Sequence, residues 1–376
     1  MIGPMTDEQL DERIRAYLSY RAEFVASHAT SAEAASTAIA GRLRSGGGRA
    51  VAPFSVARVA FALLLLLLAL VAAVYVGSLF RERYAPERPL VVVPLQGQPW
   101  AVTGAYGSIW VGSLGQASVY QLNPRDGTVT NEVALVEPVC GNIERGYGAI
   151  WAAGCGTHAL TRIDPRSLDA DRLVGYGSDG IGVGGDSVWA SDGSNVVRLD
   201  PQTLETQAEI AVGGDSIVTF GEGSAWAMLS DRGSVARIDP ATNHVVATIP
   251  LSSGPEAPAY PVHAVAAGGA LWVVDEVGLR LYRVDAVTNT ATSVPIPLTH
   301  EATDGMDFGD WYITSGRGLI WVRISDETVV GFDPTTSRVV QTQATTPGGG
   351  GAFFVADDSL WVGNNGDGTV SGMQLP

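Results

Sequence analysis

The chain has 376 residues, of which 46% are apolar and 16% are charged, so it can bury a substantial core and is not a disordered chain. Its net charge of −16 is uneven, because residues 1–58 sum to +1 and residues 81–376 to −17. An acidic region of that size repels the phosphate backbone, which excludes nucleic acid as a partner.

Residues 1–58 form the first predicted segment, which we expect to be helical and cytoplasmic. Thr6 and Gln9 make a capping-box pattern, and apolar side chains recur at helical spacing after them. One interpretation is a solvated amphipathic helix that positions the next segment. The other is a docking helix, within residues 6–45, for a cytoplasmic regulator.

Residues 59–80 are predicted to cross the lipid bilayer as one helix. These 22 residues carry no charge and lie between Arg58 and Arg81, and roughly 20 apolar residues are enough to span a bilayer. A cleaved signal peptide has a shorter apolar region and a cleavage site, so we predict an uncleaved anchor. The N-terminus would be cytoplasmic and the rest of the chain extracytoplasmic. The alternative, a helix buried in a soluble core, is difficult for so uniformly apolar a surface.

After a linker at residues 81–88, the sequence changes to a period of two and repeats through residues 89–376. One marker is a tryptophan in a strand that follows a Gly-rich turn, and it occurs at Trp110, Trp151, Trp189, Trp226, Trp272, Trp321 and Trp361. A second marker is an Asn or Asp that suits the start of a type I turn, and it occurs at Asn123, Asp164, Asp200, Asp239, Asp285 and Asp333.

A repeat of about 40 residues with four short strands is typical of a β-propeller blade. The fourth unit shows the pattern, with strands predicted at 217–221, 225–229, 234–239 and 244–251. The seventh unit ends after its third strand, predicted at 369–374. An apolar strand at 89–95 would complete it and close the ring without a free edge. The sequence therefore predicts an all-β, seven-bladed β-propeller of four-stranded antiparallel blades, preceded by an N-terminal helix and one transmembrane helix.

The repeat resembles those of the YVTN-type and virginiamycin B lyase-like propellers. The likeness rests on the segment GSVARIDPATNHVVATIP at residues 233–250 and on the GYGAIW turn that ends at Trp151. It covers about residues 89–376 and implies the seven-bladed fold. It implies no single function, because this architecture serves enzymes, binding proteins and scaffolds.

Two long loops, at residues 252–262 and 298–310, precede the inner strands of the fifth and sixth blades. Long loops on a rigid scaffold tend to carry function, so the binding face is predicted there. Candidate ligand contacts in or beside these loops are Tyr260, His300, Glu301, Asp304, Asp307, Asp310, Trp311 and Tyr312. They suit a polar or cationic small ligand, and the carboxylates also suit a divalent cation. The alternative is a solvated acidic loop that keeps the domain soluble.

His263 begins the inner strand of blade five, and Asp275 and Glu276 end its second strand, so antiparallel pairing brings them to the same face. In virginiamycin B lyase-like enzymes, a His at a strand start and a carboxylate three residues after a blade Trp take part in metal-assisted elimination. The resemblance thus implies His263 and Asp275 as catalytic candidates, although the turn is shorter and the acid is Asp rather than Glu. The alternative is a channel-lining His that is hydrogen-bonded to its neighbours.

Cys140 and Cys155 are the two cysteines of the chain. A hairpin that turns near residues 146–148 places them directly across two paired strands, which predicts a disulfide and an oxidising compartment. The alternative is a pair of buried thiols. The spacing suits no zinc site, because close ligand pairs and further partners are missing from the sequence.

These features favour a membrane-anchored, extracytoplasmic propeller that binds or senses a ligand or protein without catalysis. A metal-dependent lyase or hydrolase of the virginiamycin B lyase-like type is the first alternative. A scaffold that binds envelope proteins is the second.

Overall fold

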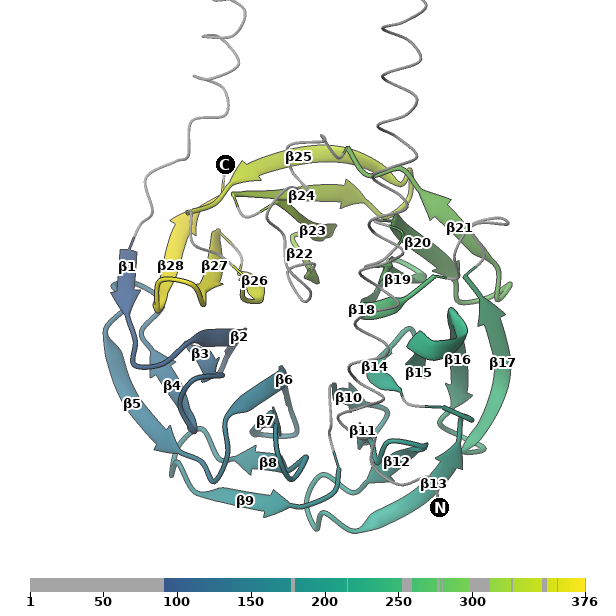
Figure 1. Cartoon of the computed structure of the whole chain (residues 1–376), viewed down its shortest axis with the longest axis horizontal. Helices are drawn as coiled ribbons and strands as arrows, with labels where there is room; N and C mark the ends of the chain where they lie inside the picture. The colour runs from purple at the N-terminus through teal and green to yellow at the C-terminus, as the bar shows by residue number, and fades with distance from the viewer. Residues whose placement is uncertain are drawn as a thin grey trace, which may run out of the picture. The chain divides into compact units, whose positions relative to one another are not determined.

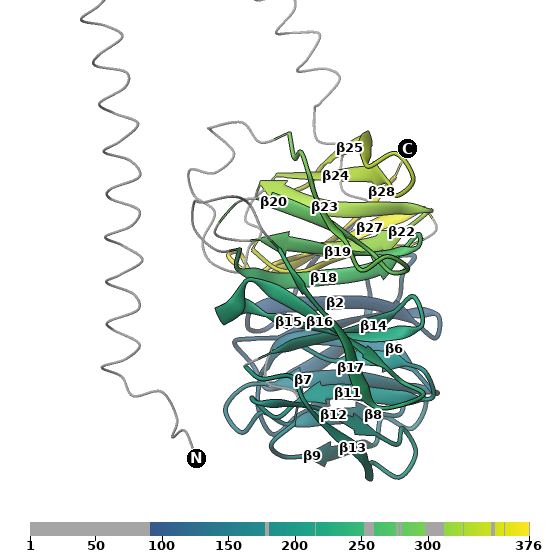
Figure 2. The same cartoon turned by 90° about the vertical axis from the view of Figure 1, so that its right-hand side faces the viewer.

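The computed structural model describes residues 91–375 apart from 177–179, 215, 252–258, 276–277, 279, 298–311, 326, 347–349 and 357. The described residues all belong to one compact unit. Their strands form seven four-stranded antiparallel sheets, arranged as blades around a central axis (Figure 1). The inner strands, such as β2 and β18, run through the thickness of the ring (Figure 2). The predicted seven-bladed, all-β propeller is confirmed.

Each blade runs from an inner strand at the channel to an outer strand at the rim. The inner strands are β2 (Pro99–Ala105), β6 (Val139–Gly146), β10 (Gly182–Gly184), β14 (Ile217–Gly221), β18 (Pro261–Ala267), β22 (Ile313–Gly316) and β26 (Phe353–Val355). The second strands are β3 (Ser108–Ser113), β7 (Ala149–Gly154), β11 (Ser187–Ser191), β15 (Ser224–Leu229), β19 (Ala270–Asp275), β23 (Leu319–Ser325) and β27 (Ser359–Asn364).

The outer half of each blade is built in the same way. The third strands are β4 (Ser118–Leu122), β8 (Leu160–Ile163), β12 (Asn195–Leu199), β16 (Ser234–Asp239), β20 (Arg280–Asp285), β24 (Thr328–Asp333) and β28 (Thr369–Gln374). The outer strands are β5 (Val129–Ala134), β9 (Ala170–Leu173), β13 (Thr206–Ala211), β17 (His244–Pro250), β21 (Ala291–Val294), β25 (Arg338–Ala344) and β1 (Val91–Pro94). A short 3₁₀ turn, η1 (Ser230–Arg232), joins β15 to β16.

The repeating tryptophans lie in the second strands and form the core between blades, each at most 1% exposed. In six blades the indole N–H donates to the last carbonyl of the inner strand at 3.0–3.2 Å, as from Trp226 to Gly221. Each of these six indoles therefore fills the interblade space and has its polar atom satisfied, whereas the buried Nε1 of Trp361 has no hydrogen-bond partner among the described residues. The adjoining turn has positive φ at Glu222 and Gly223, which explains the glycine of the repeat.

The Asx marker closes the turn between the third and outer strands. In blade three, Asp200 Oδ1 accepts the N–H groups of Gln202 and Thr203 at 2.8 and 2.9 Å. The N–H of Leu204, whose φ is 62°, then donates to the carbonyl of Asp200 at 2.9 Å. The Asx chemistry is as predicted, and the turn extends the expected type I geometry by one left-handed residue.

An arginine two residues before the Asx marker joins neighbouring blades. The Arg198 guanidinium lies over the Trp189 ring of its own blade, with 5.2 Å from Cζ to the ring centroid. It also donates to Pro240 O at 2.5 Å and to Asn243 Oδ1 at 2.9 Å, both in the next blade. This arrangement, termed the interblade clamp, ties the third strand of one blade to the turn of the next.

The interblade clamp recurs at consecutive junctions and then changes. Arg162 donates across to the turn of blade three, and Arg237 to the turn of blade five. Arg283, in the matching position of blade five, instead pairs with Asp285 of its own turn at 3.3 Å. The arginine of blade five therefore pairs within its own blade, although it occupies the same position of the repeat.

The seventh blade is completed by the strand that precedes the first. β1 pairs with β28 in an antiparallel register that runs from Val91 opposite Gly372 to Pro94 opposite Thr369. Val93 is 8% exposed and packs with side chains of blades seven and one. The predicted closure of the ring is confirmed.

The predicted N-terminal helix, the membrane span at 59–80 and the linker at 81–88 lie outside the described residues. Within the part of the chain that the structure describes, no helix has the length and apolar character to span a membrane.

Candidate functional site

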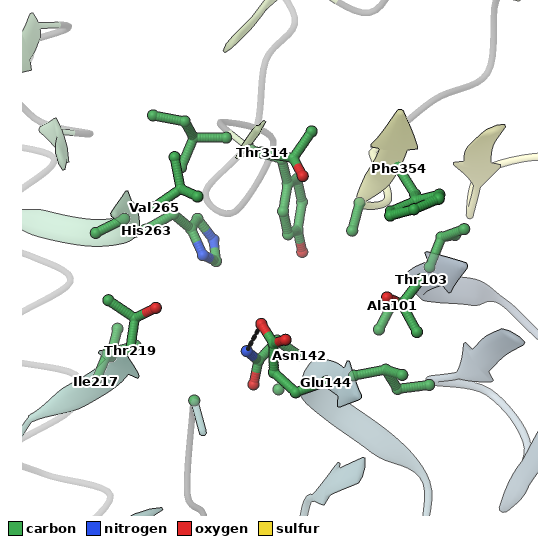
Figure 3. Close-up of a pocket in the computed structure, with 18 of the residues that line it drawn as sticks. Ala101, Thr103, Asn142, Glu144, Ile217, Thr219, His263, Val265, Thr314 and Phe354 are labelled. Carbon is green, nitrogen blue, oxygen red and sulfur yellow. Dashed lines mark hydrogen bonds between the residues drawn. The ribbon is translucent and has the colours of Figure 1, made fainter. Parts of the chain in front are cut away.

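The inner strands surround a cavity of about 320 Å³ at the centre of the ring. Runs of consecutive residues of the inner strands line this channel, such as 142–145 of β6 and 263–266 of β18. Figure 3 shows His263 and Val265 of β18 on one side of it, and Asn142 and Glu144 of β6 on another. Blades two and five thus place Glu144 and His263 in opposite parts of the channel wall.

Glu144 is the acidic group of the channel wall. Its Oε1 accepts a hydrogen bond from Asn142 Nδ2 at 3.3 Å (Figure 3). Burial raises the pKa of the Glu144 carboxyl to about 7, while the Arg145 guanidinium and the Asn142 hydrogen bond act in the lowering direction. Near neutral pH the carboxyl therefore exists in both protonation states.

Asn142 links blade two to blade three beside this carboxyl. Its Oδ1 accepts the N–H of Ile181 at 2.8 Å, and its Nδ2 donates to the carbonyl of Ile181 at 2.9 Å. The amide thus pairs with the backbone of blade three as a neighbouring strand would. This pairing fixes the orientation of the amide, so that its Nδ2 is held in position to donate to Glu144 Oε1.

His263 lies in an aromatic part of the wall. Its ring stacks on Tyr312 with centroids 4.5 Å apart, and Trp100 meets Tyr312 edge-on at 5.8 Å. The indole N–H of Trp100 donates to the carbonyl of Cys140 at 2.8 Å, which fixes the ring. Burial lowers the pKa of His263 to about 4, so the imidazole is neutral at physiological pH. Of the predicted ligand contacts, the structure places His263 and Tyr312 in the channel.

Arg145 adds a positive charge to the same cavity and is the one Lys or Arg among its described lining residues. It donates to Thr103 Oγ1 at 2.9 Å, and its Cζ lies 5.0 Å from the centroid of the Phe354 ring. A Cβ at Gly104 would lie 2.3 Å from the Phe354 ring, so glycine is required for the ring to occupy this place. In the described part of the chain Arg145 forms no ion pair.

Asp275 is placed differently from His263, with which it was paired as a catalytic candidate. A register shift puts Pro261 opposite Asp275 and His263 opposite Val274, so both candidates lie at the predicted end of blade five. The Asp275 side chain is fully buried, however, and Oδ1 accepts the backbone N–H of Tyr260 at 2.8 Å and of Gly278 at 3.0 Å. Its carboxylate supports the backbone around Tyr260, and neither residue lines the channel.

The two cysteines lie at one end of the β6–β7 hairpin, and both are half-buried. The predicted register holds near the turn, where Ile143 is opposite Ala152. Beyond it the register shifts, and the N–H of Cys155 donates to Pro138 O at 3.0 Å. The bulge therefore removes the direct opposition on which the sequence argument relied. The disulfide stays a prediction.

The remaining predicted ligand contacts lie outside the described residues. These are Glu276, His300, Glu301, Asp304, Asp307, Asp310 and Trp311. Among the residues that are described, no three His, Cys, Asp or Glu side chains gather in a way that could hold a metal ion.

Sequence reasoning missed Glu144 and Asn142 because it searched the long loops. The signal was present in β6, where Asn142 and Glu144 alternate with Ile143 on a strand predicted to line the channel. A polar side chain on the channel face of an inner strand is a stronger indication of a site than loop length, because the strand holds it rigidly.

Comparison with known families gives a partial match. A family model described as glutamine cyclotransferase matches residues 106–259, which is less than half of the chain. The matched part includes Asn142 and Glu144 and ends before His263. No curated protein matches the sequence.

Solved structures show the fold more completely. Virginiamycin B lyase from Staphylococcus aureus has a TM-score of 0.63 and 15% identity, over 76% of this chain and 98% of that one. Hydrazine synthase of Kuenenia stuttgartiensis has a TM-score of 0.60 and 14% identity, over 75% of this chain and 96% of that one. The computationally designed Ika8 protein has a TM-score of 0.56 and 11% identity, over 77% of this chain and 100% of that one. The expected likeness to virginiamycin B lyase-like propellers is confirmed, and at these identities it concerns the fold alone.

Proposed function

We propose that this protein is a membrane-anchored, extracytoplasmic propeller that binds a small ligand with a protonated amine in its central channel. The observation that carries the proposal is the Glu144 carboxyl, held in the wall of a ring-enclosed cavity. An ammonium group supplies the opposite charge that stabilises the ionised form of this carboxyl. Trp100 and Tyr312 add aromatic surface that suits a cation or an apolar group.

Isothermal titration of the full chain with phenethylamine tests this function. Binding is expected at about pH 8, where both the ammonium and the Glu144 carboxylate are formed, and should weaken as the pH falls below about 7. Glu144→Gln should reduce the affinity at least about tenfold, because a charge-assisted hydrogen bond is lost. Thr314→Ser serves as a control on another part of the channel wall. No binding to the wild type, or equal binding to Glu144→Gln, would contradict the proposal.

The membrane anchor is supported by the uncharged segment at 59–80, and its orientation by the slight excess of arginines before that segment, at Arg42, Arg44, Arg49 and Arg58, over those after it, at Arg81, Arg83 and Arg88. A phosphatase reporter that folds only outside the cytoplasm, fused after Pro376, tests the orientation. Activity is expected for the full-length fusion. Activity that is absent from a stable, membrane-bound fusion would place the propeller in the cytoplasm.

An enzyme is the second candidate, favoured by the pKa of Glu144 near 7, which suits a general acid or base. The family model described as glutamine cyclotransferase covers this residue. Incubating the full chain with a peptide that begins with glutamine tests this candidate. Loss of one ammonia from the peptide, dependent on Glu144, would establish catalysis.

The lyase and scaffold alternatives receive less support. The lyase alternative needs His263 and Asp275 to act together, and the Asp275 carboxylate is bound to backbone N–H groups beneath the surface. The scaffold alternative needs a broad apolar surface, whereas the large exposed apolar side chains of the described blades are scattered valines and tyrosines.

A further inference from the structure

We infer that the channel ligand carries a carboxylate as well as an amine, as α-amino acids do, and that Arg145 binds the carboxylate. The inference rests on the proposed binding function and narrows the class of ligand. It follows from the presence of an acidic and a basic side chain, Glu144 and Arg145, in the lining of one cavity, where the guanidinium acts electrostatically on the carboxyl.

Arg145 differs from the arginines that hold the blades together. Arg198 and Arg237 direct their guanidinium groups into the next blade, where carbonyl and amide oxygens accept their hydrogen bonds. Arg145 lines the channel instead, and within the described part of the chain its guanidinium donates one side-chain hydrogen bond, to Thr103. A guanidinium presents several N–H donors in a planar fork that matches a carboxylate. Arg145 therefore retains donors for an anionic group.

The guanidinium is also held in place. Thr103 Oγ1 fixes one of its nitrogens, and its Cζ lies over the Phe354 ring. Gly104 permits that position of Phe354 because any larger residue would collide with the ring. A pre-positioned side chain loses little conformational freedom on binding.

The two charges define the direction of a ligand along the channel. Glu144 precedes Arg145 on β6, and Arg145 lies closer to the turn that follows Gly146. Trp100 and Tyr312 come from the beginning of their inner strands, at the other end of the cavity. An amino acid with its carboxylate at Arg145 and its ammonium at Glu144 would direct an apolar side chain toward these rings. A cavity of about 320 Å³ accommodates a molecule of that size.

Three probes separate the contributions of the two charges: L-phenylalanine, phenethylamine, which lacks the carboxylate, and 3-phenylpropionate, which lacks the amine. Affinities are measured by isothermal titration of the full chain at about pH 8. L-Phenylalanine is expected to bind at least about tenfold more tightly than either analogue, because each analogue loses one charge-assisted interaction.

Arg145→Gln should lower the affinity for L-phenylalanine to that for phenethylamine and leave phenethylamine binding unchanged. Thr103→Val, which removes the hydroxyl that fixes Arg145, should give an intermediate loss. Arg125→Gln, in an exposed turn, removes the same charge away from the channel and should change neither affinity. Circular dichroism confirms that each variant is folded.

The outcomes distinguish this inference from the proposed function. Phenethylamine binding that depends on Glu144, without any gain for L-phenylalanine, would overturn the inference and leave the binding function in place. An equal loss of affinity for L-phenylalanine and for phenethylamine in Arg145→Gln would also overturn it, because Arg145 would then act on the fold of the channel. Absence of binding by all three probes would contradict both.

Discussion

Burial moves the pKa values of Glu144 and His263, on opposite sides of the channel wall, in opposite directions. It raises the pKa of Glu144 to about 7 and lowers that of His263 to about 4, because in both cases it disfavours the charged form. Between about pH 4 and pH 7 the carboxyl is mostly protonated and the imidazole is mostly neutral. An ammonium ligand that ionises Glu144 would release a proton, so binding and pH are linked.

Glu144 should make the protein less stable as the pH rises. Its pKa is 4.5 in its ordinary state and about 7 in the folded protein, so its contribution to stability is full below about 4.5 and is lost as the pH rises to about 7. The loss is at most about 3 kcal/mol. Glu144→Gln should therefore match the wild type at about pH 4 and exceed it at about pH 8, as measured by urea unfolding. Parallel pH profiles of the two proteins would refute the displaced pKa.

Asn142 should influence Glu144 through the hydrogen bond that its side chain donates. This bond favours the ionised carboxyl, so Asn142→Ala is expected to raise the pKa of Glu144 further. The carboxyl stretching band in infrared spectra, compared with that of Glu144→Gln, reports the pKa directly. Thr314→Ala is the control for a smaller side chain in the channel. An unchanged carboxyl pKa in Asn142→Ala would limit Asn142 to joining the blades.

The Cys140–Cys155 disulfide is tested by thiol alkylation of protein recovered from the membrane. We expect both cysteines to resist alkylation under denaturing, non-reducing conditions and to react after reduction. Two cysteines that react without reductant would contradict the disulfide and would remove one argument for the extracytoplasmic placement.

At the residue scale, sequence reasoning found His263 and Tyr312 but missed the carboxyl opposite them. His263 was identifiable because it lies near the start of an inner strand, β18, beside a long loop. The displaced pKa of Glu144 depends on burial by other blades, and the orientation of Asn142 depends on Ile181 in the next blade. Such long-range contacts leave no local sequence signal.

At the scale of the strand, the periodic pattern was sufficient in regular blades. The strands predicted at 217–221 and 369–374 match β14 and β28, because alternating burial and turn residues define their ends. The register near Cys140 was not predictable, since a bulge between Val139 and Ile143 displaces the pairing. A bulge depends on the packing of neighbouring strands, so an idealised hairpin does not anticipate it.

The interblade clamp predicts unequal effects of the same substitution at two matching positions. Arg237→Gln should lower the free energy of unfolding by about 2 kcal/mol, because the guanidinium bonds into blade five are lost. Arg283→Gln breaks a half-buried ion pair within one blade and should cost less than about 1 kcal/mol. Urea unfolding of both variants measures the difference. Equal effects would show that the contacts between blades add little to stability.

At the scale of the whole molecule, closure of the ring couples the two ends of the propeller sequence. β1 lies beside β28, whereas the rest of blade seven comes from the last part of the chain (Figure 1). The N–H of Leu95 donates to Gly368 O at 2.9 Å, and Tyr120 of blade one donates to Gln96 O at 3.0 Å. The segment therefore ties blade seven to blade one as well as completing its sheet.

Deleting residues 89–95 from the full chain should expose the edge of β28 and lower the melting temperature by several degrees or more, because a ladder and a packed side chain are lost. Two point variants test the packing of β1 without shortening the chain. Val93 is 8% exposed and Val92 is 48% exposed, so Val93→Ala should cost about 1–2 kcal/mol and Val92→Ala much less. Thermal unfolding followed by circular dichroism measures all three. If the deletion leaves the melting temperature unchanged, β1 does not stabilise the ring, and the seventh blade is stable with three strands.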